Sequence, residues 1–155
     1  MTARIPQEAN TTNLYEQDYY LWLKNTAQLL RDDKLSKLDR LNLIEELEDM
    51  GRSEKRAVKS NLTILLMHLL KYKYQSEKRS KSWLRTIVEH RRRLLILLED
   101  SPSLKNYLQE VFDNSYQAAR QDAATETQLP FNSFPVDCPF SSEEILNCNY
   151  LPSNQ

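Results

Sequence analysis

Residues 54–74 read EKRAVKSNLTILLMHLLKYKY, and this stretch decides the fold. Its apolar side chains recur every three or four positions, which is the period of one face of an α-helix. These residues are Val58, Leu62, Leu65, Leu66, Leu69 and Tyr72. No proline interrupts residues 7–101, and Gly51 is the single glycine among 155 residues. Because tight β-turns depend on glycine and proline, the composition argues against a β-sheet and predicts an all-α fold.

The same periodicity predicts four more long helices, which together with residues 54–74 would form a five-helix bundle. They cover about residues 15–32, 39–50, 83–99 and 102–125. Asp39 and Ser82 are residue types that cap helix N-termini, and each precedes an expected helix. Ser101 and Pro102 mark the start of the last long helix, because proline is favoured at the first helical position.

Gly51 lies between the expected helices over residues 39–50 and 54–74. Glycine is common just past the C-terminal end of a helix, and Ser53 is placed to cap the following helix. We therefore expect a break or a kink at this position. The alternative is one continuous helix, in which the missing side chain of Gly51 lets another helix cross closely.

The C-terminal residues 129–155 differ in character, because they hold four of the six prolines of the chain. Ser141 and Glu144 have the spacing of a capping box, which predicts one short helix. Three phenylalanines would form an aggregation-prone surface if exposed, so we expect this arm to pack on the bundle. They are Phe131, Phe134 and Phe140. We predict three parts: a disordered or extended N-terminus (1–13), a helical bundle (14–128) and a C-terminal arm with a short helix (129–155).

The sequence shows no sign of export or of membrane insertion. No apolar run approaches the roughly 20 residues that span a bilayer, and residues 1–13 lack the apolar segment of a secretory signal. Cys138 and Cys148 are too few for a cysteine-rich metal site, and free thiols fit a reducing compartment. We therefore expect a soluble, cytoplasmic protein without a metal ion or another cofactor.

Charge is distributed unevenly along the chain, although the formal net charge is −1. Residues 52–93 carry 13 basic and 3 acidic side chains, whereas the segments on either side are acidic. The cations cluster, with aromatic residues among them, around the turn between the helices over 54–74 and 83–99, which we call the basic hairpin. Its candidate binding residues are Lys71, Lys73, Tyr74, Lys78, Arg79, Lys81 and Trp83.

Two interpretations of the basic hairpin stay open. Cations interleaved with aromatic rings are typical of surfaces that bind phosphates and stack bases, so the hairpin is a candidate nucleic-acid interface. Alternatively, the acidic segments neutralise it, either within one chain or across an oligomer. We favour the second interpretation, because composition alone is weak evidence for nucleic-acid binding.

The two histidines of the chain, His68 and His90, form a second candidate site. Each lies on or beside an apolar stripe at a similar distance from the turn, so they should face each other in an antiparallel helix pair. Such a pair is a candidate catalytic or ligand site. Partly buried histidines more often make structural hydrogen bonds, and we favour this structural role for His68 and His90.

Arg85 and His90 have the R-x4-H spacing of the all-helical ribonucleases called HEPN. In those enzymes the arginine steadies a phosphate and the histidine assists the attack of the ribose hydroxyl. The motif is short, so chance matches are common. Five residues also correspond to about 140° around a straight helix, so the two side chains need not converge.

Five segments together resemble one bacterial family. They are YEQDYYLWL (15–23), NLIEELEDMGRSE (42–54), HLLK (68–71), RSKSW (79–83) and DSPSL (100–104). The family is catalogued as a domain of unknown function, number twenty-nine of its series. The resemblance covers nearly the whole chain and implies an all-helical, intracellular bacterial protein. It implies no activity and no catalytic residues.

The sequence alone leaves the function unknown. We expect an interaction protein that forms a symmetric dimer, because the aromatic residues of the first helix exceed what one helical stripe can bury. These residues are Tyr19, Tyr20 and Trp22. The alternative is a small RNA-directed ribonuclease or toxin-like component that uses Arg85 and His90, so whether the protein is an enzyme stays open.

Overall fold

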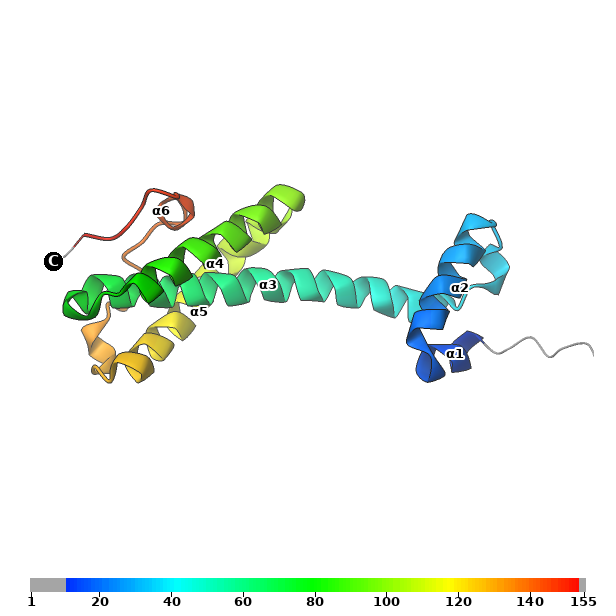
Figure 1. Cartoon of the computed structure of the whole chain (residues 1–155), viewed down its shortest axis with the longest axis horizontal. Coiled ribbons are helices and arrows are strands. Elements are labelled where there is room, and N and C mark those ends of the chain that lie inside the picture. Colours follow the sequence, from blue (N-terminus) through cyan, green and yellow to red (C-terminus); the bar gives the residue numbers. More distant parts are fainter. Residues whose placement is uncertain (1–10, 154–155) are drawn as a thin grey trace, which may run out of the picture. The chain divides into compact units, whose positions relative to one another are not determined.

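The structure is a computed structural model that describes residues 11–153 (Figure 1). The α-helices are α1 (Thr11–Gln17), α2 (Tyr19–Arg31), α3 (Arg40–Tyr74), α4 (Lys81–Asp100), α5 (Leu104–Thr127) and α6 (Ser142–Leu146). Three short 3-10 helices join them, namely η1 (Leu35–Lys37), η2 (Ser76–Lys78) and η3 (Phe131–Ser133). No strand occurs between residues 11 and 153, so the predicted all-α fold is confirmed. Most of the predicted N-terminal segment, residues 1–10, lies outside the described residues.

The chain divides into two compact units, Met1–Arg52 and Ser53–Gln155, which we call unit 1 and unit 2. Unit 1 holds α1, α2, η1 and the first part of α3. Unit 2 holds the second part of α3 and all the elements that follow it.

The predicted break at Gly51 is wrong, because α3 runs without interruption from Arg40 to Tyr74. Asp39 precedes this helix as predicted, and its carboxylate accepts a hydrogen bond from the Asn42 amide at 3.4 Å. Gly51 is exposed, and a Cβ atom there would meet nothing within 4 Å, so no described element crosses closely at this point. Glycine costs roughly 1 kcal/mol inside a helix, and the helix-forming residues on both sides outweigh that cost.

The predicted helix over residues 15–32 is interrupted at Asp18, so its start was placed wrongly. α1 ends at Gln17 and α2 begins at Tyr19. The Asp18 carboxylate accepts a hydrogen bond from the Leu21 amide at 2.9 Å, which caps α2. The N-capping preference of aspartate therefore wins over the apolar periodicity that continues through this position.

Aromatic side chains hold unit 1 together. The rings of Tyr15 and Tyr19 pack on Trp22, which is buried. Both tyrosine hydroxyls donate to the Glu46 carboxylate of α3 at 2.5 Å. The hydrogen bond to Glu46 is the main reason why the pKa of Tyr15 rises to about 12, because the carboxylate favours the protonated phenol. Glu46 thus links both N-terminal helices to the first part of α3.

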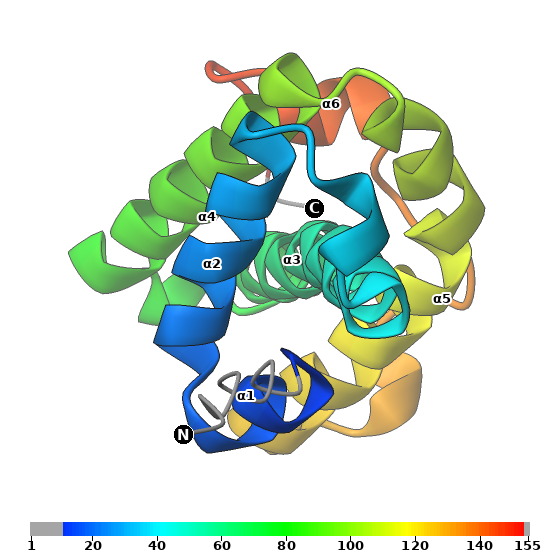
Figure 2. The same ribbon diagram turned by 90° about the vertical axis from the view of Figure 1, so that its right-hand side faces the viewer.

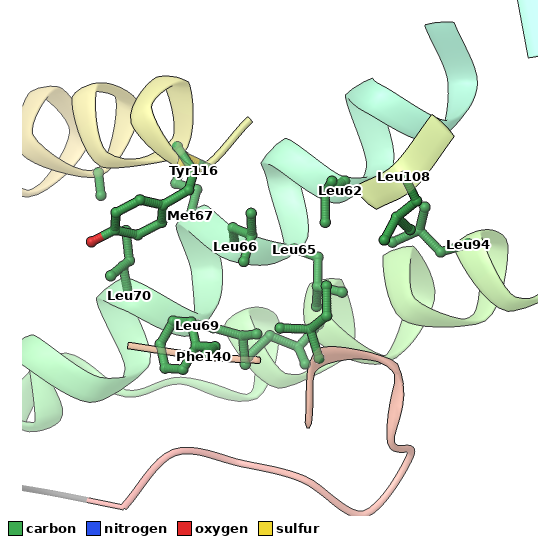
Figure 3. Close-up of a cluster of buried hydrophobic side chains, with 14 of the residues drawn as sticks. Leu62, Leu65, Leu66, Met67, Leu69, Leu70, Leu94, Leu108, Tyr116 and Phe140 are labelled. Atoms are coloured by element: carbon green, nitrogen blue, oxygen red, sulfur yellow. The ribbon is translucent and has the colours of Figure 1, made fainter. Parts of the chain in front are cut away.

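Unit 2 is built around the second part of α3. The view in Figure 2, which looks along α3, places α4 and α5 on opposite sides of it. The apolar stripe predicted from residues 54–74 forms the centre of the core, joined by Leu94 of α4 and by Leu108 and Tyr116 of α5 (Figure 3). Five of the six predicted stripe residues are fully buried, namely Val58, Leu62, Leu65, Leu66 and Leu69.

The starts of α4 and α5 differ from the prediction by two residues each. Ser80 caps α4 in place of Ser82 and accepts a hydrogen bond from the Trp83 amide at 3.2 Å. Helix α5 begins at Leu104, so Ser101 and Pro102 lie in the turn before it. Several serines stand near each boundary, and the capping preference alone does not distinguish between them.

The C-terminal arm packs on unit 2, as predicted. Phe134 and Phe140 are buried, whereas Phe131 is 39% exposed, so the prediction is wrong for that one ring. Arg120 of α5 covers the Phe131 ring, with its guanidinium carbon 3.8 Å from the ring centre. The predicted capping at the start of α6 is confirmed, because the Ser141 hydroxyl accepts a hydrogen bond from the backbone amide three residues later at 3.1 Å.

Two buried arginines fasten the arm to the helices. Arg91 of α4 donates to the carbonyl oxygens of Ile145 at 2.6 Å and of Tyr150 at 2.9 Å. Arg120 donates to the carbonyl oxygen of Phe134 at 3.0 Å. Burial lowers the pKa of the Arg91 guanidinium, since the side chain is charged away from water. Both arginines bind backbone oxygens instead of carboxylates.

Candidate functional site

The inner side of the basic hairpin pairs its cations with its own aromatic rings. Lys71 is buried, forms an ion pair with Glu126 of α5 at 2.7 Å and lies over the ring of Trp83 at 4.6 Å. Arg79 lies 3.9 Å from the centre of the Tyr72 ring and donates to the Tyr72 carbonyl oxygen at 2.7 Å. The cations and rings that suggested a ligand site therefore contact each other.

The remaining aromatic residue of the hairpin is also engaged. The ring of Tyr74 is half-buried, packs edge-on against Phe134 and has the amino group of Lys73 at 5.9 Å from its centre. Burial raises the pKa of Tyr74. Lys78 in the turn and Lys81 at the start of α4 are exposed to solvent.

The outer side of α4 carries a stripe that we call the basic face. Its cations are Lys81, Arg85 and Arg92, which are exposed and recur at spacings of four and seven residues, so they lie on one side of the helix. Val88 and Ile96 lie on the same side and are 59% and 45% exposed. Lys81 and Arg85 form no ion pair with any residue between 11 and 153. The basic face therefore combines unpaired cations with exposed aliphatic side chains.

The exposed Glu99 lies on the same side of α4 as the basic face, one turn after Ile96, and Glu89 lies beside that face. The Glu89 carboxylate accepts hydrogen bonds from Arg92 at 2.7 Å and from Arg93 at 2.8 Å. These bonds lower the pKa of Glu89. A single carboxylate thus faces two guanidinium groups, so this part of α4 keeps a net positive charge.

The two histidines take part in hydrogen bonds within the helix pair. Nδ1 of His90 lies 2.7 Å from Oδ1 of Asn61, and Nδ1 of His68 lies 3.0 Å from the carbonyl oxygen of Ile64. The Nδ1 atom of His68 therefore donates a proton to that carbonyl. Burial is the main cause that lowers the pKa of both imidazoles, and each is neutral at pH 7.

The structure does not bring Arg85 and His90 together. Arg85 is exposed on the basic face, whereas the hydrogen bond of His90 points to Asn61 of α3. The spacing of five residues separates the two side chains by about 140° around α4. Asn61 and Glu126 are the residues near the histidines that the sequence did not suggest. Asn61 lies seven positions before His68 and so on the same face of α3, which is a signal that the sequence did contain.

A polar pocket of about 430 Å³ lies between α5 and the C-terminal arm. Asp113, Asp137 and Cys138 are among its lining residues. Burial raises the pKa of the Cys138 thiol to about 11, so it is protonated at neutral pH and is a poor nucleophile. Among residues 11–153, no three His, Cys, Asp or Glu side chains converge in a group that could hold a metal ion.

The family model described as Domain of unknown function DUF29 matches residues 14–151. The chain belongs to this family. The resemblance noted in the sequence is thereby confirmed, and the DUF29 description assigns no activity. No curated protein and no solved structure matches the chain. Within residues 11–153 of this DUF29 protein, no helix is long and apolar enough to cross a membrane.

Proposed function

We propose that this DUF29 protein is an interaction protein that binds an acidic, amphipathic protein segment on the basic face of α4. The observation that supports this proposal is the mixed chemistry of the face. Lys81 and Arg85 are cations without an acidic partner among the described residues, and Val88 and Ile96 add exposed aliphatic surface on the same side. A helix with acidic and apolar side chains at matching spacing complements both features.

A protein partner fits this chemistry better than a nucleic acid does. Binding to single-stranded RNA or DNA relies on aromatic rings that stack on bases, and the rings of the hairpin are covered by their own cations. Trp83 lies under Lys71, and Tyr72 lies under Arg79. The aliphatic side chains in the middle of the cationic stripe also have no charge and no hydrogen-bond donor that could bind a phosphate.

The ribonuclease alternative has no support from the geometry, because Arg85 and His90 lie on different sides of α4. It stays a prediction that an assay can address. Substitution of His90 by alanine should remove any ribonuclease activity while the helical content is kept, if His90 is catalytic. A structural His90 predicts a loss of stability instead, because the side chain of Asn61 would lose its partner.

Selection from a displayed library of helical peptides tests the proposed function. Peptides of about 16 residues would cover the roughly 22 Å of helix from Lys81 to Ile96. Selected peptides should carry Asp or Glu together with Leu, Ile or Met at helical spacing. The double substitution Lys81→Glu and Arg85→Glu should weaken their binding at least about tenfold, since each reversal turns attraction into repulsion.

A matched control is available on α3, where Arg56 and Lys59 are exposed cations outside the basic face. The double substitution Arg56→Glu and Lys59→Glu changes the net charge equally and should leave peptide binding unchanged. Equal losses in both variants would mean that only net charge matters, which contradicts a specific face. Salt-dependent binding of a labelled single-stranded RNA, lost with Lys81→Glu and Arg85→Glu, would replace the proposal with the nucleic-acid interpretation.

A further inference from the structure

The first part of α3, in unit 1, carries an exposed acidic and apolar surface that we call the acidic face. Its apolar members are Leu41, Ile44 and Leu47, which are 82%, 49% and 59% exposed. Glu45 and Glu48 are exposed and lie four positions after Leu41 and Ile44, so these four side chains share one side of the helix, with Leu47 at its edge. Glu46, which binds the tyrosines of unit 1, points to the other side.

The acidic face keeps a negative charge in spite of nearby cations. Arg52 contacts Glu45 at 3.0 Å and Glu48 at 3.8 Å, and it also pairs with Asp49. Three carboxylates thus share one guanidinium group, and this cluster keeps a negative charge next to the exposed Arg40 at the start of α3. The side chains of the cluster are half-exposed, which leaves them free to face a partner.

The acidic face has the properties that the basic face of α4 requires. The acidic face presents carboxylates beside three aliphatic side chains, and the basic face presents cations beside two aliphatic side chains. Two copies of the same face would repel each other, whereas the two unlike faces attract. Every chain carries one of each, so a second copy of the chain supplies the complement in equal number.

We infer that the acidic face of one chain docks on the basic face of a second chain, and that the second chain reciprocates. The inference rests on the proposed function and names its partner as this chain itself. In the inferred dimer a two-fold axis relates the two chains, so the same pair of unlike faces meets twice. The same contact removes five exposed aliphatic side chains of each chain from water.

Charge reversal followed by mixing tests this arrangement. The acidic-face variant carries Glu45→Lys and Glu48→Lys, and the basic-face variant carries Lys81→Glu and Arg85→Glu. Light scattering at up to about 100 µM should show a dimer for the unmodified chain and a monomer for each variant alone. A mixture of the two variants should form a heterodimer, because both of its interfaces then join unlike charges again.

A chain with all four substitutions should dimerise by the same logic, and this variant also shows that the substituted helices still fold. The control for the acidic-face variant is Asp122→Lys with Glu143→Lys, which reverses two exposed acids outside both faces and should stay dimeric. An unmodified chain that is monomeric throughout the concentration range overturns the inference. So does a mixture of the two variants that stays monomeric. Neither result touches the proposed function if selected acidic peptides still depend on Lys81 and Arg85.

Discussion

Arg91 is the residue whose removal should do the most damage to the attachment of the C-terminal arm. Its guanidinium is 3% exposed and donates to the carbonyl oxygens of Ile145 and Tyr150, on either side of the turn that follows α6. The most informative substitution is Arg91→Met. Methionine keeps most of the packing volume, so the loss reports the hydrogen bonds and not a cavity.

The expected loss in the free energy of unfolding is the balance of three contributions. Hydrogen bonds from a charged donor contribute about 1.5–3 kcal/mol each, so two of them set a gross loss of about 3–6 kcal/mol. The guanidinium has no acidic partner in its site, and its removal recovers the cost of burying that charge, which amounts to several kcal/mol in real proteins. Both carbonyl oxygens are then left without their donor, which adds a penalty of about 1–3 kcal/mol for each buried one. We expect a net loss of roughly 2–4 kcal/mol, because the unmet carbonyls and lost bonds exceed the recovered charge.

Urea denaturation followed by circular dichroism measures this loss. The neighbouring substitution Arg92→Met is the control, since Arg92 is exposed and should leave the free energy of unfolding unchanged. Deletion of the arm after Leu129 should lower the melting temperature as well. If the free energy of unfolding of Arg91→Met lies within about 0.5 kcal/mol of that of the unmodified protein, the two hydrogen bonds do not hold the arm, because ordinary surface substitutions give changes of that size.

The same structure supports three further predictions. Phe134→Ala should cost about 3–5 kcal/mol in a denaturant titration, whereas Phe131→Ala at its half-open site should cost clearly less. Gly51→Ala should raise thermal stability by about 1 kcal/mol, because the position is helical, exposed and free of clashes. His68 and His90 have lowered pKa values in the folded state, so the folded protein binds fewer protons than the unfolded chain. The free energy of unfolding should therefore fall as the pH drops below 6.5, and His68→Gln with His90→Gln should flatten this dependence.

Each of these expectations has an outcome that contradicts it. Equal losses for the two phenylalanines would mean that the arm is not docked as described. A destabilising Gly51→Ala would indicate that the helix bends or is crossed at that residue. Stability that stays constant between pH 7.5 and 5.5, measured with urea at each pH, would mean that burial does not keep the imidazoles neutral.

The helical core was predictable because a single periodic pattern determines it. The apolar stripe of residues 54–74 is buried along its length, and the aromatic arm docks as its phenylalanines indicated. Local breaks were less predictable, since they depend on a balance of small energies. Asp18 ends a helix that the apolar pattern continues, whereas Gly51, a residue that often ends helices, sits inside one. An aspartate cap stabilises a helix start by about 1 kcal/mol, and a glycine inside a helix costs about the same, so small local effects decide where a helix ends.

The candidate site was predictable only in part, because identical residue types have different roles in it. Arg91, Arg92 and Arg93 are consecutive, yet the first is buried under the arm and the other two face solvent. The partners of Arg91 lie more than 50 residues further along the chain, so no local pattern could separate it from its neighbours. Lys71 is also buried, and its ion-pair partner Glu126 follows it by 55 positions.

The way in which unit 2 pairs its cations supports the proposed partner. The two arginines that this unit buries, Arg91 and Arg120, donate to backbone carbonyl oxygens. The partly buried Arg79 donates to a carbonyl oxygen and lies over the Tyr72 ring. Lys71 with Glu126 is the described ion pair that links two helices there. One cation of the basic hairpin, Lys71, is paired with the acidic C-terminal segment through Glu126. Neutralisation of the other cations, within one chain or across an oligomer, stays a prediction. The unpaired positive charge lies on the outer side of α4, next to exposed aliphatic side chains whose burial would be favourable. The partner that we propose for this surface is an acidic amphipathic helix, and we infer that the first part of α3 in a second chain supplies it.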